Sequence, residues 1–474
     1  MCSLGRFPDI PITNDISICQ VDGKIQYASA DFPNLQLYTD SVSDHPKIAV
    51  PKDALNQPRV STSTGTVFLP GDHSLLERIE DAWFESGIGR VLDILDDEST
   101  VFKYPARYLR MFMKSVQQII KYTIVPSYEE YKSHVHTERE KFPVVSVAWH
   151  PHFTMIAVAT RDDTITIYSH NSNFNPILKS KAQRRITCIE WRPLSLGELA
   201  VACSAGVYLW DIDTENIITR PAISTSARLL PGSYVTSISW SPDGNYLATS
   251  NGYSNCLTIW SPDEMRRVGL RNIGGISQVS WSPDLTKIMV CSGSDIMRVW
   301  KTTDWTAEPW KTSGGAAVHP VWSKDGAVLL FATRNDPCLC CINFSSQLFS
   351  SETTQTNVVQ SVADLARVEI GDDLIVGGEV TGMAWDPLSQ YLAVIFKNSP
   401  LVAVFYTKTA PVLAVKPGFF VKGSADEVPT TVTFQFNFGE GANLTICWSS
   451  GRVQYFPIVS SASRSRHNVI RKGF

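Results

Sequence analysis

The 474-residue sequence has no long apolar run and little charge imbalance. No window approaches 18 consecutive apolar residues, and Asp9, Asn14 and Asp15 interrupt the stretch where a signal peptide would be apolar. Lys and Arg number 42 against 46 Asp and Glu, and the resulting net charge of −4 argues against wrapping nucleic acid. We therefore expect a protein that is neither secreted nor membrane-spanning and that does not bind nucleic acid directly.

Motifs of catalysis are also missing. The sequence contains no GxxxxGK, GxGxxG, HExxH or GxSxG, which removes support for phosphate, dinucleotide, zincin and serine-hydrolase chemistry. Cys338, Cys340 and Cys341 lack a second cysteine pair, and His150 and His152 lack a third ligand. The ten cysteines are scattered, as expected for reduced thiols in the cytosol or nucleus rather than a disulfide scaffold. We expect no enzyme activity, no cofactor and no metal.

What the sequence does contain is a repeat. An aromatic residue followed by a turn signal recurs at spacings of 42, 49, 41, 41, 63 and 49 residues. Most of these are close to the roughly 40 to 45 residues of one propeller blade. The predicted blade anchors are Trp149, Trp191, Trp240, Trp281, Trp322, Trp385 and, more weakly, Phe434.

A second set of positions supports this register. About 20 residues after each anchor, as blade-sized repeats require, a β-rich run ends at Tyr168, Trp210, Trp260, Trp300, Ile342, Phe405 and Tyr455. The pattern resembles WD-type repeats and predicts an all-β, seven-bladed propeller over residues 140–457. The Gly-His dipeptide of that signature is absent, so we expect packing to replace its buried polar network.

Four segments surround or interrupt the repeats. Residues 1–70 are expected to be extended, with a hairpin at 16–29 around Asp22-Gly23 that could supply the outer strand of the seventh blade. The apolar periodicity of residues 71–135 predicts a short N-terminal helical segment. Residues 345–375 predict a surface loop between blades five and six, and 458–474 a basic, Ser-rich tail.

One face of the predicted helical segment is basic. Arg107, Arg110, Lys114 and Lys121 fall on a stripe opposite apolar residues. Such a stripe is either the solvated face of a helix packed on the propeller, or a contact with a membrane surface or an acidic partner. Trp305 and Trp310 are further candidates for a partner contact, because the repeat does not account for them.

Beyond the repeats, the chain resembles the aladin family of WD-repeat nucleoporins. The resemblance rests on MCSLG at 1–5 with Phe7-Pro8, VAWHPH at 147–152, LAVAC at 199–203, TSISWSPDG at 236–244, WSPD at 281–284, VADL at 362–365, GGE at 377–379, MAWDP at 383–387 and WSSGR at 448–452. It implies a non-catalytic scaffold of the nuclear pore complex at the nuclear envelope. It also implies partners among other nucleoporins, including a transmembrane anchor, and roles in nucleocytoplasmic transport and spindle organisation.

Three other functions stay open at this level. A ubiquitin-ligase substrate receptor needs Trp-Asp-x-Arg, where the chain has Trp210-Asp211-Ile212-Asp213. A phosphoinositide-binding propeller needs Arg-Arg-Gly, and Arg266-Arg267-Val268-Gly269 carries one extra residue. An enzyme would need a cluster of perturbed acids or histidines in the central channel.

Overall fold

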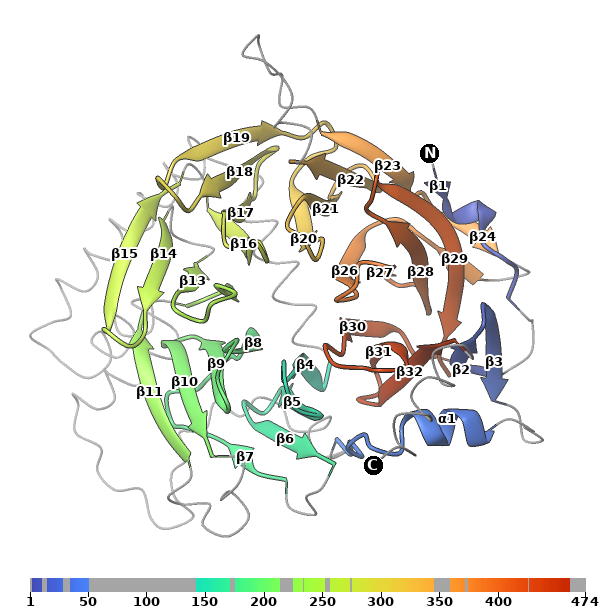
Figure 1. Ribbon diagram of the computed structural model, residues 1–474, viewed down its shortest axis with the longest axis horizontal. Coiled ribbons are helices and arrows are strands. Elements are labelled where there is room, and N and C mark those ends of the chain that lie inside the picture. Colours follow the sequence, from blue (N-terminus) through green and yellow to red (C-terminus); the bar gives the residue numbers. More distant parts are fainter. Residues whose placement is uncertain are drawn as a thin grey trace, which may run out of the picture.

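The computed structural model describes residues 2–10, 15–28, 35–50, 142–170, 175–213, 225–232, 234–251, 256–272, 275–344, 359–370, 374–424 and 426–460. In this part of the chain, seven sheets are arranged radially around a common centre (Figure 1). Two helical elements accompany them, the single turn η1 (Leu4–Arg6) and the helix α1 (Leu35–Ser41). The predicted all-β, seven-bladed propeller is confirmed. The predicted helical segment at 71–135 lies outside the described residues.

Five blades are four-stranded antiparallel sheets whose strands run in chain order from the centre to the rim. Blade 1 contains β4 (Val144–Trp149), β5 (Met155–Thr160), β6 (Ile165–Ser169) and β7 (Ile177–Leu178). Blade 2 contains β8 (Cys188–Trp191), β9 (Glu198–Cys203), β10 (Gly206–Ile212) and β11 (Thr225–Pro231). Blade 3 contains β12 (Ser237–Trp240), β13 (Leu247–Ser250), β14 (Cys256–Ser261) and β15 (Arg266–Arg271). Blade 4 contains β16 (Ile276–Trp281), β17 (Lys287–Ser292), β18 (Ile296–Lys301) and β19 (Ala307–Lys311). Blade 6 contains β26 (Val380–Trp385), β27 (Tyr391–Phe396), β28 (Leu401–Lys408) and β29 (Ala414–Lys422).

Blades 5 and 7 have five strands because each receives strands from the start of the chain. Blade 5 contains β20 (Ala317–Trp322), β21 (Val328–Thr333), β22 (Cys338–Asn343), β23 (Gln360–Asp364) and β1 (Cys2–Ser3). Blade 7 contains β30 (Pro429–Phe434), β31 (Gly441–Trp448), β32 (Val453–Val459), β2 (Ile16–Val21) and β3 (Lys24–Ala28).

The expected hairpin in residues 16–29 is formed by β2 and β3, and it completes blade 7. β2 pairs in parallel with β32, with Gln20 opposite Ile458 and Val21 opposite Val459. The side-chain amide of Gln454 in β32 also donates to the carbonyl oxygen of Ser17 at 2.6 Å. The strand that closes the last blade therefore comes from the beginning of the sequence, which leaves no unpaired edge on β32.

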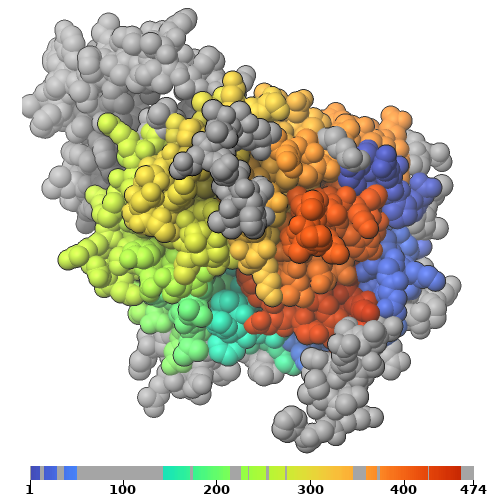
Figure 2. All heavy atoms as spheres, turned by 45° about the horizontal axis from the view of Figure 1, so that its top comes forward, coloured from blue at the N-terminus to red at the C-terminus, as the bar shows by residue number. Residues whose placement is uncertain are grey.

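The first residues also fill the core between blades 5 and 6. Leu4 is 1% exposed, and Phe7 stacks on Phe420 with ring centroids 4.6 Å apart. In Figures 1 and 2 the N-terminal segment, coloured blue, runs along the rim beside the orange and red strands of the later blades. We call residues 2–10, 15–28 and 35–50 the N-terminal belt.

The last part of the belt contacts blades 7 and 1. Nε2 of His45 lies 2.6 Å from Oε1 of Gln435, and burial lowers the pKa of the His45 imidazole. The hydroxyls of Tyr455 and Tyr168 donate to the carbonyl oxygens of Pro46 and Ala49, at 2.8 and 3.1 Å. The belt thus bridges the blade that ends the propeller and the blade that begins it.

One expectation about the insertion between blades 5 and 6 is wrong. Residues 345–358 are outside the described part, but the rest of the predicted loop carries the strand β23 and a two-stranded hairpin, β24 (Val368–Ile370) and β25 (Leu374–Val376). Ala363, Leu365 and Val376 are buried in the core of blades 5 and 6. Only Asp364 separates Ala363 from Leu365, so the apolar pattern of this segment is too short to predict a strand among the surrounding Ser and Thr residues.

Candidate interaction surfaces

The first strand of each blade ends at its anchor, and the anchors are buried as predicted. Trp149, Trp191, Trp240, Trp281, Trp322 and Phe434 are at most 9% exposed, and Trp385 is half-buried. Several indoles link neighbouring blades: that of Trp191 donates to the carbonyl of Ala148, and that of Trp149 to the hydroxyl of Thr445. The indole nitrogens of Trp240 and Trp281 are buried without a hydrogen-bond partner in the described part of the chain. Apolar packing, rather than the buried polar network of WD-type repeats, therefore holds these two indoles in place.

Serine and aspartate build the turn after the anchor. In blade 3 the Ser241 hydroxyl accepts from the Tyr246 N–H at 2.9 Å and donates to Asp243 at 2.5 Å. Burial opposes ionisation of Asp243, but hydrogen bonds from Ser241 and Asn245 outweigh it and lower the pKa of the carboxyl. Blades 4 and 5 repeat the arrangement with Ser282 and Asp284, and with Ser323 and Asp325. The turn motif of the sequence thus has a side-chain mechanism.

Glycine lets these turns approach each other. Gly244 has φ of +71°, and a Cβ there would lie 2.5 Å from the carbonyl oxygen of Pro193 in blade 2. Gly326 has φ of +67°, and a Cβ there would lie 2.6 Å from Cγ of Asp284 in blade 4. Any other residue would be strained and would separate the two blades.

Hydrogen bonds also join the turns of neighbouring blades. The His150 ring Nε2 lies 3.2 Å from the carbonyl of Leu196, while Nδ1 accepts from two backbone N–H groups. Because Nδ1 is an acceptor, Nε2 must carry the proton and donate to Leu196. Burial lowers the His150 pKa to about 4, so the ring is neutral at pH 7. His150 thus links blade 1 to blade 2.

Arg192 makes the corresponding link between blades 2 and 3. Its Nε donates to the carbonyl of Gly244 at 2.7 Å, and its two terminal nitrogens contact Asp263 at 3.0 and 2.7 Å. One of them also donates to the buried Glu198 at 2.6 Å, and the guanidinium lies 5.3 Å from the Trp240 ring centroid. The hydrogen bonds that the guanidinium donates to Asp263 and Glu198 hold the pKa of Arg192 above its usual value.

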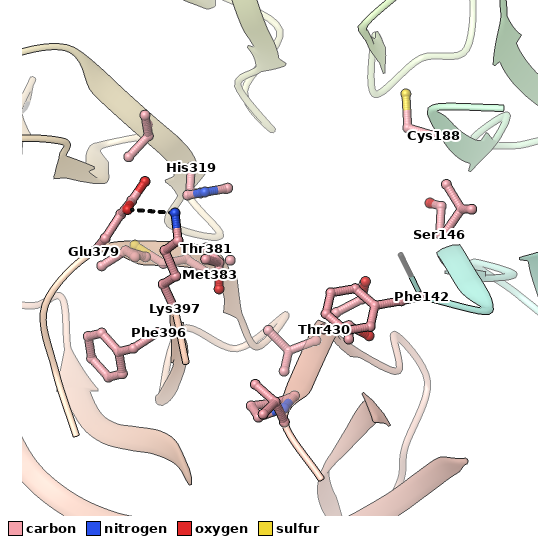
Figure 3. Close-up of a pocket in the computed structure, with 18 of the residues that line it drawn as sticks. Phe142, Ser146, Cys188, His319, Glu379, Thr381, Met383, Phe396, Lys397 and Thr430 are labelled. Atoms are coloured by element: carbon pink, nitrogen blue, oxygen red, sulfur yellow. Dashed lines mark ion pairs between the residues drawn. The ribbon is translucent and has the colours of Figure 1, made fainter. Parts of the chain in front are cut away.

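A cavity of about 420 Å³ lies where the first strands converge, at the end opposite these turns. Figure 3 shows the side chains around it: His319, Glu379, Met383 and Lys397 on one side, Ser146 and Cys188 on the other. Lys397 and Glu379 form an ion pair at 3.3 Å. The pair neutralises these two charges, and Arg334 is a further charged residue in the lining.

Glu190 and His319 line a second cavity of about 310 Å³, which shares His319 and Met383 with the first. Confinement away from bulk water raises the Glu190 pKa to about 8, although its carboxylate accepts from the Trp240 N–H at 3.3 Å. Gln278 accepts from the His319 N–H at 2.6 Å and also contacts the ring. Among the described residues no three His, Cys, Asp or Glu side chains are grouped to hold a metal ion.

The remaining sequence candidates divide into three groups. Arg107, Arg110, Lys114 and Lys121 lie outside the described residues. Trp310 is 3% exposed in the core of blades 4 and 5, so its expected role as a partner contact is wrong. Cys340 and Cys341 are buried core residues, as predicted. In the part of the chain that the structure describes, no helix is long and apolar enough to cross a membrane.

The signals that sequence reasoning missed lie in the belt. Leu4 and Phe7 belong to the MCSLG and Phe7-Pro8 segments, which carry the resemblance but have no blade pattern. His45 gives no local signal at all, because its partners Gln435 and Asn443 are almost 400 residues away in sequence.

Radial sheets, buried anchors and linked turns together define a WD-type seven-bladed β-propeller. A family model described as the aladin seven-bladed propeller matches residues 129–459. The chain therefore belongs to the aladin family.

One individual relative agrees with this assignment, and two further matches are not aladins. The chain is 26% identical over 347 residues to aladin of Arabidopsis thaliana, covering 66% of this chain and 75% of that protein. It is 27% identical over 222 residues to protein HIR1 of Mycosarcoma maydis, covering 40% of this chain and 22% of that one. A chain in a crystal structure of the mitotic checkpoint complex superposes with a TM-score of 0.50 at 11% identity, covering 66% of this chain and 89% of that one. At this identity the last similarity concerns the fold alone.

Proposed function

We propose that this protein is a non-catalytic scaffold or adaptor nucleoporin, held at the nuclear envelope within the nuclear pore complex. There it supports nucleocytoplasmic transport and contributes to spindle organisation. Its partners are other nucleoporins, including a transmembrane nucleoporin that anchors it, and its own contact with the envelope is peripheral. The observation that carries this proposal is the match of the aladin family over residues 129–459.

Two features of the chain support an adaptor over a barrier-forming nucleoporin. The sequence has a single Phe-Gly dipeptide, Phe438-Gly439, and the Phe438 ring packs 5.8 Å from that of His45 instead of standing free. A propeller braced by cross-blade bonds presents fixed surfaces on two faces and a rim, which suits the simultaneous binding of several partners.

The receptor alternative gains no support from the geometry. Trp210 is buried in β10, and its indole donates to Oε1 of Gln183 at 2.8 Å. The tryptophan of the candidate motif is therefore committed to an internal contact.

The test is the location of the full chain carrying a fluorescent tag, imaged in interphase cells with a pore marker. We expect a punctate nuclear rim that overlaps the pores. A diffuse cytosolic or chromatin signal, with the tag intact, would overturn the proposal.

A further inference from the structure

Large apolar side chains stand exposed at the turns between the first and second strands of the blades. These turns contain seven of the thirteen exposed large apolar residues of the described chain: Phe153 (44% exposed), Leu194 (72%), Leu196 (73%), Tyr246 (43%), Leu285 (39%), Leu388 (52%) and Phe436 (55%). Since the first strands are all innermost, their turns lie at the same end of the propeller. Single exposed leucines are ordinary, but a set that recurs at the same turn of six blades forms a surface.

On blades 7, 1, 2 and 3 the turns that carry these residues are bonded one to the next, and we call this part of the surface the turn face. It consists of Phe436, Phe153, Leu194, Leu196 and Tyr246. The cross-blade bonds described above, from His150 to Leu196 and from Arg192 to Gly244, hold its neighbouring turns together. The side chain of Asn437 adds a bond to the carbonyl of Pro151, which joins blade 7 to blade 1. A fixed apolar surface loses little conformational freedom on binding.

The charge around the turn face is negative. The carboxylates in its turns, and in the turns between third and fourth strands at the same end, are Glu440, Asp243, Asp213, Asp263 and Glu264. Asp211 lies close to this end of β10. The described residues of these turns contain no lysine. The one arginine of these turns, Arg192, is paired with Glu198 and Asp263. In the adjoining strands, Arg228 is paired with Glu198 and Arg266 with Glu264, so the carboxylates still outnumber the cations. A ligand that covers the apolar residues would therefore meet acidic groups at its margins.

The longest undescribed segment, residues 51–141, is flanked by residues at the other face. Val50 Cγ1 lies 3.7 Å from where a Cβ would be on Gly451, in the turn between the second and third strands of blade 7. Phe142 lines the same cavity as Lys397, and Lys397 lies in the corresponding turn of blade 6. The described residues on either side of 51–141 therefore lie away from the turn face. The basic tail, by contrast, follows Val459, which ends β32 at the same end as the turn face. The charge of the face thus identifies the occupant as an apolar and basic segment, which we assign to a partner, and the test below separates it from the chain's own tail.

We propose that the turn face binds an amphipathic segment of a partner protein, in which Leu- or Phe-sized side chains are flanked by Lys or Arg. The apolar side chains would pack among Leu194, Leu196 and Phe153, and the cations would lie beside Asp243 and Glu440. This names the chemistry of one partner of the proposed adaptor, and it rests on that function. Its test measures binding in solution and does not depend on where the protein is located.

The experiment measures fluorescence anisotropy with the purified full chain. The probe is a labelled peptide of about 18 residues, five helical turns, with Leu on one face and Lys on the other. A matched peptide carries Glu in place of each Lys. The test variant is Leu194→Ser with Leu196→Ser, and the control variant is Ile177→Ser, which alters a side chain that is 65% exposed on β7 at the rim.

We expect the Lys peptide to bind, the Glu peptide not to bind, and the double variant to bind about tenfold more weakly or worse. The control variant should bind like the unaltered chain, and all three proteins should melt at the same temperature. Equal affinity in the double variant, or no binding of the Lys peptide at about 1 mM, would overturn the proposal.

Other occupants give distinct results. Concentration-dependent dimers, or binding to vesicles with anionic lipids, that disappear in the double variant would assign the face to a second copy or to a membrane. Tighter binding by a chain that ends at Ser460 would assign it to the chain's own basic tail. Each result would overturn the proposal. A nuclear-rim signal without peptide binding would reject this inference alone, whereas peptide binding with a diffuse signal would reject the proposed location alone.

Discussion

Phe7 stacks on Phe420 with ring centroids 4.6 Å apart and meets Phe405 edge-on at 4.9 Å. The partners belong to the third and fourth strands of blade 6, about 400 residues later in the chain. The start of the chain therefore supplies part of the core of a late blade, and it does so before continuing to blade 7.

Phe7→Ala is expected to lower the free energy of unfolding by about 3 kcal/mol, because it empties a buried aromatic site. Denaturant unfolding followed by tryptophan fluorescence measures this change. Phe153→Ala is the control, since Phe153 is 44% exposed and should change stability little. Equal losses in the two variants would contradict the packing described for Phe7.

Deletion of residues 1–30 should lower the melting temperature of the propeller. It removes β1, β2 and β3, and with them the strand that pairs with β32. Calorimetry of the shortened and full chains tests this, and Ile18→Asp in the full chain should act in the same direction because Ile18 is buried in β2. An unchanged melting curve for the deletion would refute the role of the belt.

Acid should destabilise the protein through His150. Its pKa of about 4 in the folded state lies below the unfolded value of about 6.5, so the unfolded chain binds the extra proton between these values. The stabilisation is complete above pH 6.5 and is lost as the pH falls toward 4, by at most about 1.4 kcal/mol per pH unit.

His150→Asn is the matched variant for this titration. Its side-chain oxygen can still accept the backbone N–H groups, but it does not titrate. We expect lower stability at pH 7, because the bond to Leu196 is lost, together with a flatter pH profile of unfolding. Parallel profiles for the two proteins would show that His150 is not the titrating group.

Arg192→Met should destabilise the propeller by roughly 2 to 3 kcal/mol. The change leaves the Glu198 carboxylate buried with Arg228 as its remaining cation, and it removes the bond to Gly244. Urea unfolding compares it with Arg266→Met, whose side chain is 80% exposed and should contribute within about 0.5 kcal/mol. A loss no larger than that of the control would mean that the cross-blade network contributes nothing.

Reversal of the basic stripe, as Arg107→Glu, Arg110→Glu and Lys114→Glu, should weaken retention at the nuclear envelope while the propeller stays folded. The physical reason is the loss of attraction between this stripe and an acidic partner or anionic lipid. Photobleaching of the tagged protein at the rim measures retention, and the melting temperature reports folding. Normal retention with normal folding would leave the stripe as a solvated face.

Sequence reasoning located the blades because each blade repeats a local pattern. Trp240 with Ser241 and Asp243 specifies the end of a strand and the turn that follows, and this information lies within a few neighbouring residues. The same locality explains the error at residues 345–375. There, β23 has only a short apolar alternation, and its strand character depends on pairing with β22.

The links between turns could not be predicted in the same way. Nothing near His150 in the sequence indicates that its ring nitrogen reaches Leu196, and nothing near Arg192 indicates Asp263 as its partner. The exposed residues of the turn face were equally hidden, since Leu194 and Phe436 become neighbours on one surface only when the blades are arranged in a ring.

The sequence by itself determined the repeat, the number of blades, the buried anchors and the turn chemistry, because each arises from periodicity and short-range hydrogen bonding. Only the tertiary structure decided which strand closes blade 7, where Phe7 packs, and which turns meet around the ring. These are contacts between segments up to hundreds of residues apart. They depend on the closure of the ring as a whole, in which the last blade must find its outer strand at the beginning of the chain.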